Sequence, residues 1–184
     1  NHSNSYALGA WISRTGRVYT HGAGQNGSHG SNYAPGQINR SYANEVVFNH
    51  VEWWQSRDNG GSGRMTTPDG QPPKCIQLEM GYDWCYALFN NGEVWAWGSG
   101  GNGDGARGDQ DSTASVGIPR RVEGLQDIKI VKISSSYGHY NSTGAVDGQR
   151  HVLALDDQGY VYSWGQNDVG QLGVGDTTSR YQAT

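Results

Sequence analysis

Three copies of one strand–turn–strand pattern recur along the chain, and this repetition constrains the fold more than any other feature of the sequence. The copies are anchored on the turn glycines Gly16, Gly92 and Gly159. A valine follows each of these glycines two positions later, and a second glycine follows six positions later. Recurrence at a spacing of tens of residues is typical of repeat architectures, in which each unit stacks on its neighbours. The sequence therefore predicts a row of similar small sheets.

Each copy is predicted to form a β-hairpin. In the third copy, apolar or aromatic residues recur at alternate positions on both sides of the turn at Gly159, which is the pattern of a half-buried strand. A glycine after Asn91 or Gln158 supplies the positive φ angle that a tight turn needs. A further strand precedes each of the last two copies, at Cys75–Leu78 and Ile130–Ile133. The repeat unit is thus three or four short strands, and we predict an all-β fold.

The third copy resembles the repeat of the regulator of chromosome condensation family, a seven-bladed β-propeller. The second copy keeps Trp97 and Gly98 but has Trp84 where the family has a histidine, and the first copy has His21 where the family has a tryptophan. The resemblance implies a partial β-propeller of about three blades of short antiparallel strands, as part of a larger ring. The residues of the third copy that carry it are His151, Leu153, Ala154, Leu155, Gly159, Val161, Tyr162, Ser163, Trp164, Gly165, Asn167, Gly170, Gln171, Leu172, Gly173, Gly175 and Asp176.

One propeller segment is expected over residues 1–184, with repeat hairpins near residues 9–30, 75–109 and 130–176. The turn glycines lie 92 − 16 = 76 and 159 − 92 = 67 residues apart, which is longer than the usual repeat of the family. Insertions are therefore expected within residues 30–74 and 137–150. Three blades do not close a ring, and we expect the chain to be an excerpt of a longer protein in which residues 1–9 finish an earlier blade.

The insertions are where a private function is expected, because loops on a rigid scaffold carry most binding residues. Trp53 and Trp54 are candidates for an exposed aromatic patch, and packing of both against the propeller is the alternative. Tyr137, His139 and Tyr140 make the second insertion aromatic and adaptable, as binding loops are. A hairpin that merely packs on a neighbouring blade is the alternative there.

The sequence offers no catalytic residues, and we expect no enzyme activity, no cofactor and no metal. The six histidines lack metal-ligand spacing, and no serine lies in a nucleophile motif. His21 is expected to pack where the other copies have buried tryptophans, and Asp156 and Asp157 are expected to be solvated on a turn. Cys75 and Cys85 lie too far apart along a predicted hairpin for a disulfide, so we predict two free thiols.

One tripeptide, Arg107-Gly108-Asp109, resembles an integrin-binding sequence. The glycine and the aspartate occupy the columns of Gly175 and Asp176 in the third copy, so the repeat accounts for both. We therefore favour a structural role for this tripeptide.

Composition narrows the partners. With a net charge of −4 and only 16% charged residues, the chain has no basic field for nucleic acid. No apolar run approaches the length of a membrane span. Scarce lysine with abundant Asn, Ser and aromatic residues favours an extracellular or viral-particle surface over the cytoplasm.

We therefore expect a non-catalytic β-propeller scaffold for protein–protein interaction or assembly. An extracellular or viral-particle adhesin that binds glycan through the aromatic insertion loops is an alternative. Guanine-nucleotide exchange is a third possibility that the family resemblance alone implies, since scaffold strands carry no information about an exchange surface.

Overall fold

The computed structural model describes residues 2–4, 8–24, 30, 38–48, 73–81, 84–98, 106–110, 116–136, 139–140, 146–147 and 150–184. All regular elements within these ranges are strands, which confirms the expected all-β fold, and no helix there is long and apolar enough to cross a membrane. The strands are β1 (His2–Asn4), β2 (Leu8–Ile12), β3 (Val18–Gly24), β4 (Ile38–Glu45), β5 (Cys75–Met80), β6 (Trp84–Phe89), β7 (Val94–Gly98), β8 (Val116–Arg121), β9 (Ile130–Ser135), β10 (His139–Tyr140), β11 (Val146–Asp147), β12 (His151–Asp156) and β13 (Val161–Gly165).

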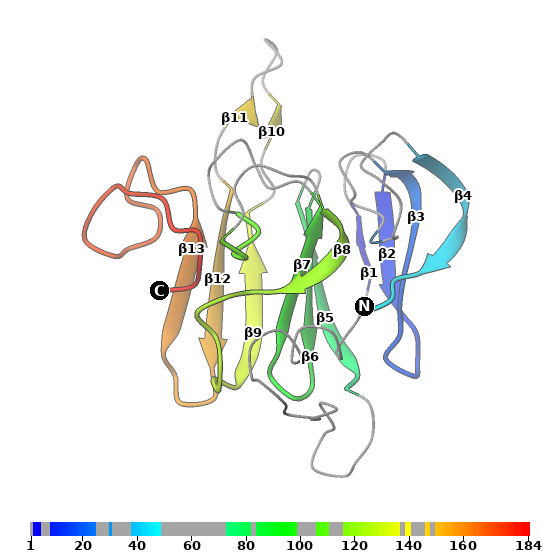
Figure 1. The fold of residues 1–184 in the computed structure, drawn as a ribbon, viewed down its shortest axis with the longest axis horizontal. Coiled ribbons are helices and arrows are strands. Elements are labelled where there is room, and N and C mark those ends of the chain that lie inside the picture. The colour runs from blue at the N-terminus through cyan, green and yellow to red at the C-terminus, as the bar shows by residue number, and fades with distance from the viewer. Residues whose placement is uncertain are drawn as a thin grey trace, which may run out of the picture.

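Three antiparallel sheets stand side by side in chain order, as the blades of a partial propeller (Figure 1). Blade 1 has the strand order β1-β2-β3-β4, blade 2 has β5-β6-β7-β8, and blade 3 has β9-β12-β13. Strand β1 holds the place in blade 1 that β5 holds in blade 2. The expectation that residues 1–9 finish an earlier blade is therefore wrong, because these residues begin the first sheet.

Residues 180–184 run along β13 as β4 and β8 run along β3 and β7. Gly165 bridges to Arg180, and Ser163 exchanges two backbone hydrogen bonds of 3.1 Å with Thr184. Four steps on the outer segment thus oppose two on β13, which is the geometry of a β-bulge. The same offset separates the outer and inner residues of the other blades, namely Arg40 and Asn44 against Gly22 and Thr20, and Val116 and Arg120 against Gly98 and Ala96.

The three turn glycines have equivalent conformations. Their φ angles are 82° at Gly16, 91° at Gly92 and 92° at Gly159, a region that residues with a Cβ rarely adopt. Each glycine amide donates to the carbonyl three residues earlier, over 3.0, 2.9 and 3.3 Å respectively. The equivalence of the three copies inferred from sequence is confirmed at this position.

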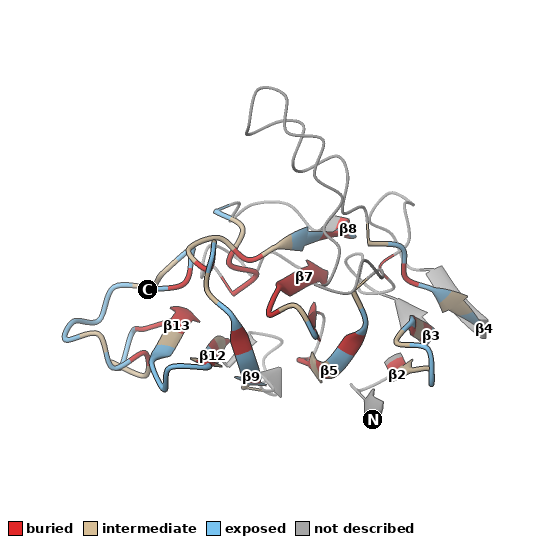
Figure 2. Ribbon diagram, turned by 90° about the horizontal axis from the view of Figure 1, so that it is seen from below, coloured by how far each residue is buried: buried red, intermediate tan, exposed pale blue. Residues whose placement is uncertain are grey.

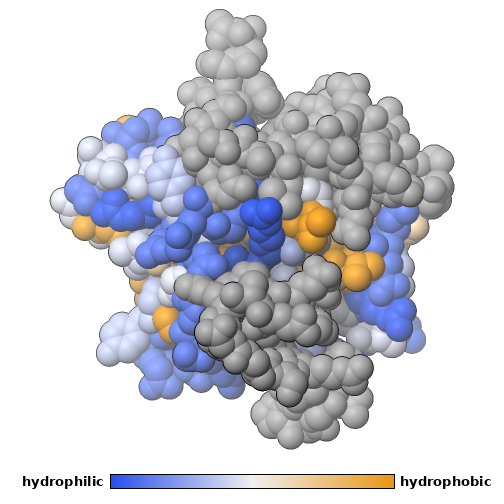
Figure 3. Space-filling model, in the orientation of Figure 1, coloured by the Kyte–Doolittle hydropathy of each residue, from blue (hydrophilic) through white to orange (hydrophobic). Residues whose placement is uncertain are grey.

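Two apolar cores fill the spaces between adjacent blades. Successive side chains of a strand point to opposite faces of a sheet, so each blade has a forward face, toward the next blade, and a rear face, toward the preceding one. Figure 2 shows buried residues on the strands of blades 2 and 3, and the described surface in Figure 3 is mostly hydrophilic. The forward face of blade 1 (Ala10, Ile12, Val18) packs on the rear face of blade 2 (Cys85, Ala87, Phe89, Trp95, Trp97), and the forward face of blade 2 (Tyr86, Leu88, Val94) packs on the rear face of blade 3 (Val152, Ala154, Trp164).

A side-chain amide also ties two blades together. The amide nitrogen of Gln77 in β5 donates to the carbonyl of Ile133 in β9 at 2.6 Å. The backbone amide of Ile133 donates to Oε1 of Gln77 at 3.0 Å. This reciprocal pair satisfies backbone groups of β9 that would otherwise lie unpaired between the blades.

Both cysteines are free and buried, opposite Phe89 for Cys75 and opposite Met80 for Cys85. Burial raises the pKa of Cys75 to about 12, so its thiol is protonated at neutral pH. We expect a water-soluble disulfide reagent at pH 8 to label neither thiol in the native protein and both thiols in denaturant. Rapid native labelling of Cys75, followed by mass spectrometry, would contradict this burial.

Candidate functional site

The five residues singled out from the sequence fall in two groups. Trp53, Trp54 and Tyr137 lie outside the described residues. His139 and Tyr140 form β10, which pairs antiparallel with β11. The structure therefore brings His139 and Tyr140 together on one strand of a short hairpin.

The β10–β11 hairpin emerges between β9 and β12 of blade 3. These two strands pair directly with each other, so the hairpin is an elaboration of the turn between them. In Figure 1 the hairpin stands beyond one end of the three blades. This placement leaves the hairpin free to meet another molecule without disturbing the sheets.

Hydrogen bonds close the base of the hairpin. The backbone amide of Ser136 donates to the carbonyl of His151 at 3.0 Å, and the backbone amide of His151 donates to Oγ of Ser136 at 2.9 Å. On the other side, the backbone amide of Gln166 donates to the carbonyl of Arg150 at 2.8 Å. The two ends of residues 137–149 are thereby held next to each other on blade 3.

A cation–π contact joins blades 2 and 3 beside this base. The guanidinium carbon of Arg150 lies 4.9 Å from the ring centroid of Trp84, and both side chains are buried. Trp84 in turn lies against Gly81, where an added Cβ would come within 1.9 Å of the indole ring. The sequence showed Trp84 only as a departure from the family histidine and gave no signal for Arg150, because the two residues meet only when the blades stack.

The integrin-like tripeptide is part of the scaffold. Arg107 is fully buried, and its Nε donates to Oδ2 of Asp109 at 2.8 Å while an Nη donates to the carbonyl of Gly98 at 3.3 Å. The side chain of Asp109 is only 4% exposed and also accepts from Arg120 at 3.4 Å. Neither charged group is accessible to an integrin-type receptor, which agrees with the structural role favoured from the sequence.

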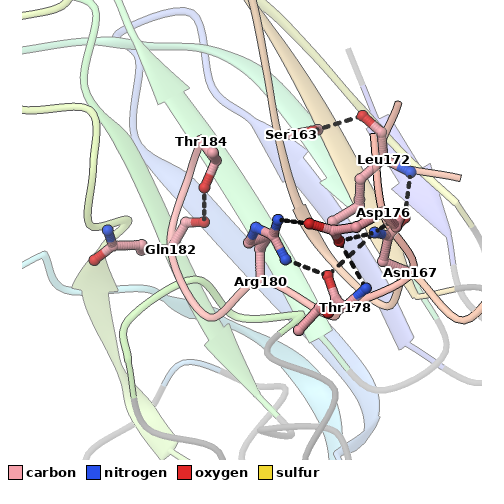
Figure 4. A network of polar contacts seen from close by, with 8 residues as sticks. All are labelled: Ser163, Asn167, Leu172, Asp176, Thr178, Arg180, Gln182 and Thr184. Atoms are coloured by element: carbon pink, nitrogen blue, oxygen red, sulfur yellow. Dashed lines mark hydrogen bonds and ion pairs between the residues drawn. The ribbon is translucent and has the colours of Figure 1, made fainter. Parts of the chain in front are cut away.

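The loop that follows β13 is fixed by one buried amide (Figure 4). The side-chain nitrogen of Asn167 donates to the carbonyls of Asp176 at 2.8 Å and Thr178 at 3.1 Å, and its oxygen accepts from the amide of Leu172 at 2.9 Å. Arg180 donates to the Asp176 carboxylate at 2.6 Å, and this bond is the main cause of the lowered pKa of Asp176. The polar residues of this loop therefore hold its shape.

Two expectations about polar residues are wrong. His21 is exposed and lies against Trp11, with ring centroids 5.3 Å apart, because no described blade covers the rear face of blade 1. Asp156 is buried, 6% exposed, because Oδ1 accepts from the backbone amides of Gln158 at 2.9 Å and Tyr160 at 2.8 Å within the turn. Within the described ranges, no group of three or more His, Cys, Asp or Glu could hold a metal ion.

Comparison with known proteins places these features in context. Residues 91–140 and residues 145–171 match family models that are both described as a Regulator of chromosome condensation (RCC1) repeat. The human E3 ubiquitin-protein ligase HERC2 is 35% identical over 140 residues, which cover 71% of this chain and 3% of HERC2. The Ultraviolet-B receptor UVR8 of Arabidopsis thaliana is 29% identical over 128 residues, which cover 66% of this chain and 25% of UVR8.

Solved structures show the same fold. Yeast RCC1 (Prp20), solved bound to Kap60, superimposes with a TM-score of 0.64 at 19% identity and covers all of this chain and 36% of the Prp20 chain. The chain thus spans only a small part of each of these relatives. The likeness at this identity establishes the propeller fold, which the strand order of the three blades also shows.

Proposed function

Because this chain is an RCC1-type repeat protein, we propose that it serves as a non-catalytic scaffold that binds another protein through the β10–β11 hairpin. The observation that carries the proposal is the projecting hairpin on a closed base. A hairpin held at both ends loses less conformational freedom on binding than a free loop would. Tyrosine and histidine on such a hairpin provide contact area and hydrogen bonds at low entropic cost.

The relatives are compatible with a protein partner. Prp20 was solved in complex with Kap60, so an RCC1-type propeller can bind another protein. HERC2 is a ligase, but this chain matches only 3% of its length, so the ligase activity of the whole protein is no argument for catalysis in these repeats. Among the described residues nothing favours glycan binding or guanine-nucleotide exchange, and we do not propose either.

A site-specific crosslinking experiment tests the hairpin. A photo-crosslinking amino acid is placed at position 140 in the hairpin or, as the control, at position 160, where Tyr160 is 68% exposed on blade 3. We expect position 140 to capture a protein that position 160 does not. Binding of that purified protein should then weaken at least ~10-fold on Tyr140→Ala, as for an aromatic anchor of an interface.

A control variant separates contact from scaffold damage. Tyr160→Ala should leave both the affinity and the thermal unfolding midpoint unchanged, because Tyr160 lies away from the hairpin. Equal capture by the two positions, or unchanged affinity of the Tyr140→Ala variant, would contradict the proposed role of the hairpin.

A further inference from the structure

We propose that the forward face of blade 3 binds the rear face of blade 1 in a second copy of this chain. The inference is independent of the partner proposed for the hairpin. It begins from the rule that the two internal interfaces obey, in which apolar side chains of one forward face meet the rear face of the next blade. Blade 1 offers small aliphatic groups (Ala10, Ile12, Val18) to the aromatic rings of blade 2 (Phe89, Trp95, Trp97).

The forward face of blade 3 has the same aliphatic character but is uncovered. Leu153 is 38% exposed and Val161 is 61% exposed, and Leu155 between them is paired with Val161. Their counterparts in blade 2 are Tyr86, Leu88 and Val94, and each is at most 2% exposed because blade 3 covers it.

The rear face of blade 1 carries an aromatic cluster formed by Trp11, Tyr19 and His21. The rings of Trp11 and Tyr19 are stacked at 5.9 Å and 16°, and the imidazole of His21 lies 5.3 Å from Trp11. His21 also covers Gly9, where an added Cβ would come within 2.3 Å of its Nε2. The cluster is thus ordered before any partner arrives.

These aromatic residues occupy the positions that blade 2 uses to meet blade 1. Trp11, Tyr19 and His21 pair across β2 and β3 as Ala87, Trp95 and Trp97 pair across β6 and β7. In blade 2 those side chains are fully or almost fully buried against blade 1. In blade 1 Trp11 and Tyr19 are only partly buried and His21 is exposed.

The two open faces are therefore complementary in the same sense as the internal interfaces. They lie on the outermost blades of the row, as Figure 1 shows, so the contact must be head to tail between copies. A head-to-tail contact is heterologous, because different surfaces of the two copies meet. Desolvation of aliphatic groups on aromatic rings supplies the driving force.

Mass measurement by light scattering over a range of concentrations tests the association. We expect the wild-type mass to rise from that of one chain to at least twice that value. Val161→Asp on the forward face and His21→Asp on the rear face should each remain at the mass of one chain. Ile118→Asp, a control at a 44% exposed residue of β8 in the middle blade, should associate as the wild type does.

Mixing the two single-face variants gives the decisive result. Each variant retains the face that the other has lost, so an equimolar mixture should form a complex of two chains and no larger one. Circular dichroism and the thermal midpoint of each variant confirm folding. A wild type that stays at one mass at every concentration, as expected if another repeat of a longer protein covers the face, overturns the proposal. So does a mixture that stays at the mass of one chain.

Discussion

Replacement of Trp164 by alanine is expected to lower the free energy of unfolding by about 3–5 kcal/mol, the range for removing a large buried aromatic side chain. Trp164 is fully buried between blades 2 and 3, where its indole N–H donates to the carbonyl of Ala106 at 3.0 Å. Its ring also meets the edge of Tyr86, with centroids 6.1 Å apart. The substitution therefore removes packing and a buried hydrogen bond at the same interface.

Denaturant unfolding, monitored by circular dichroism, measures this loss. Trp164→Phe should cost less, because a ring still fills part of the space and the hydroxyl of Tyr86 still donates to the carbonyl of Ala106. Tyr160→Ala, at an exposed position of the same blade, should change the free energy of unfolding by less than ~0.5 kcal/mol. A loss below about 1 kcal/mol for Trp164→Ala would mean that this interface contributes little to the fold.

The second large effect is expected at Gly92, with Gly159 as its matched control. Both glycines have φ near 90°, so alanine is strained at either position by about 1–2 kcal/mol. A Cβ at Gly92 would also lie 2.7 Å from Cα of Lys129, whereas a Cβ at Gly159 would meet nothing within 4 Å. We therefore expect Gly92→Ala to cost about 2 kcal/mol more than Gly159→Ala, because backbone of blade 3 must shift.

The pair isolates the contact between blades from the conformation of the turn. Urea midpoints of the two variants, measured under identical conditions, give the difference directly if the slopes agree. Equal losses at the two positions would show that only the backbone conformation matters. The carbonyl of Gly92 also accepts from the amide of Ile130 at 3.2 Å, so a shift there disturbs the first strand of blade 3 as well.

The fold was predictable where its causes are local. A glycine at Gly92 or Gly159 turns the chain whatever surrounds it, and alternating side chains define the strands on either side. The fourth segment of blade 3 was missed because its pairing with β13 is interrupted by a bulge, so residues 180–184 show no alternation. The burial of Asp156 was missed because the carboxylate bonds to amides of its own turn, which hydropathy does not reveal.

The candidate site was less predictable, because its supports are long-range. Arg150 and Trp84 are 66 positions apart (150 − 84), and no local pattern links them until blades 2 and 3 are stacked. The alignment of His21 with Trp97 is correct as a position but not as an environment, because burial depends on a covering blade. Tyr137, Trp53 and Trp54 remain predictions.

The closed base of the β10–β11 hairpin has an evolutionary consequence. Because Ser136 and His151 hold its two ends together, the segment between them can change in length and composition without altering the packing of β9 on β12. The entropy of closing a loop grows slowly, by about 0.6 kcal/mol for each doubling of its length. We expect this turn to accept foreign recognition sequences, so that new specificities can be acquired while the blades are inherited unchanged.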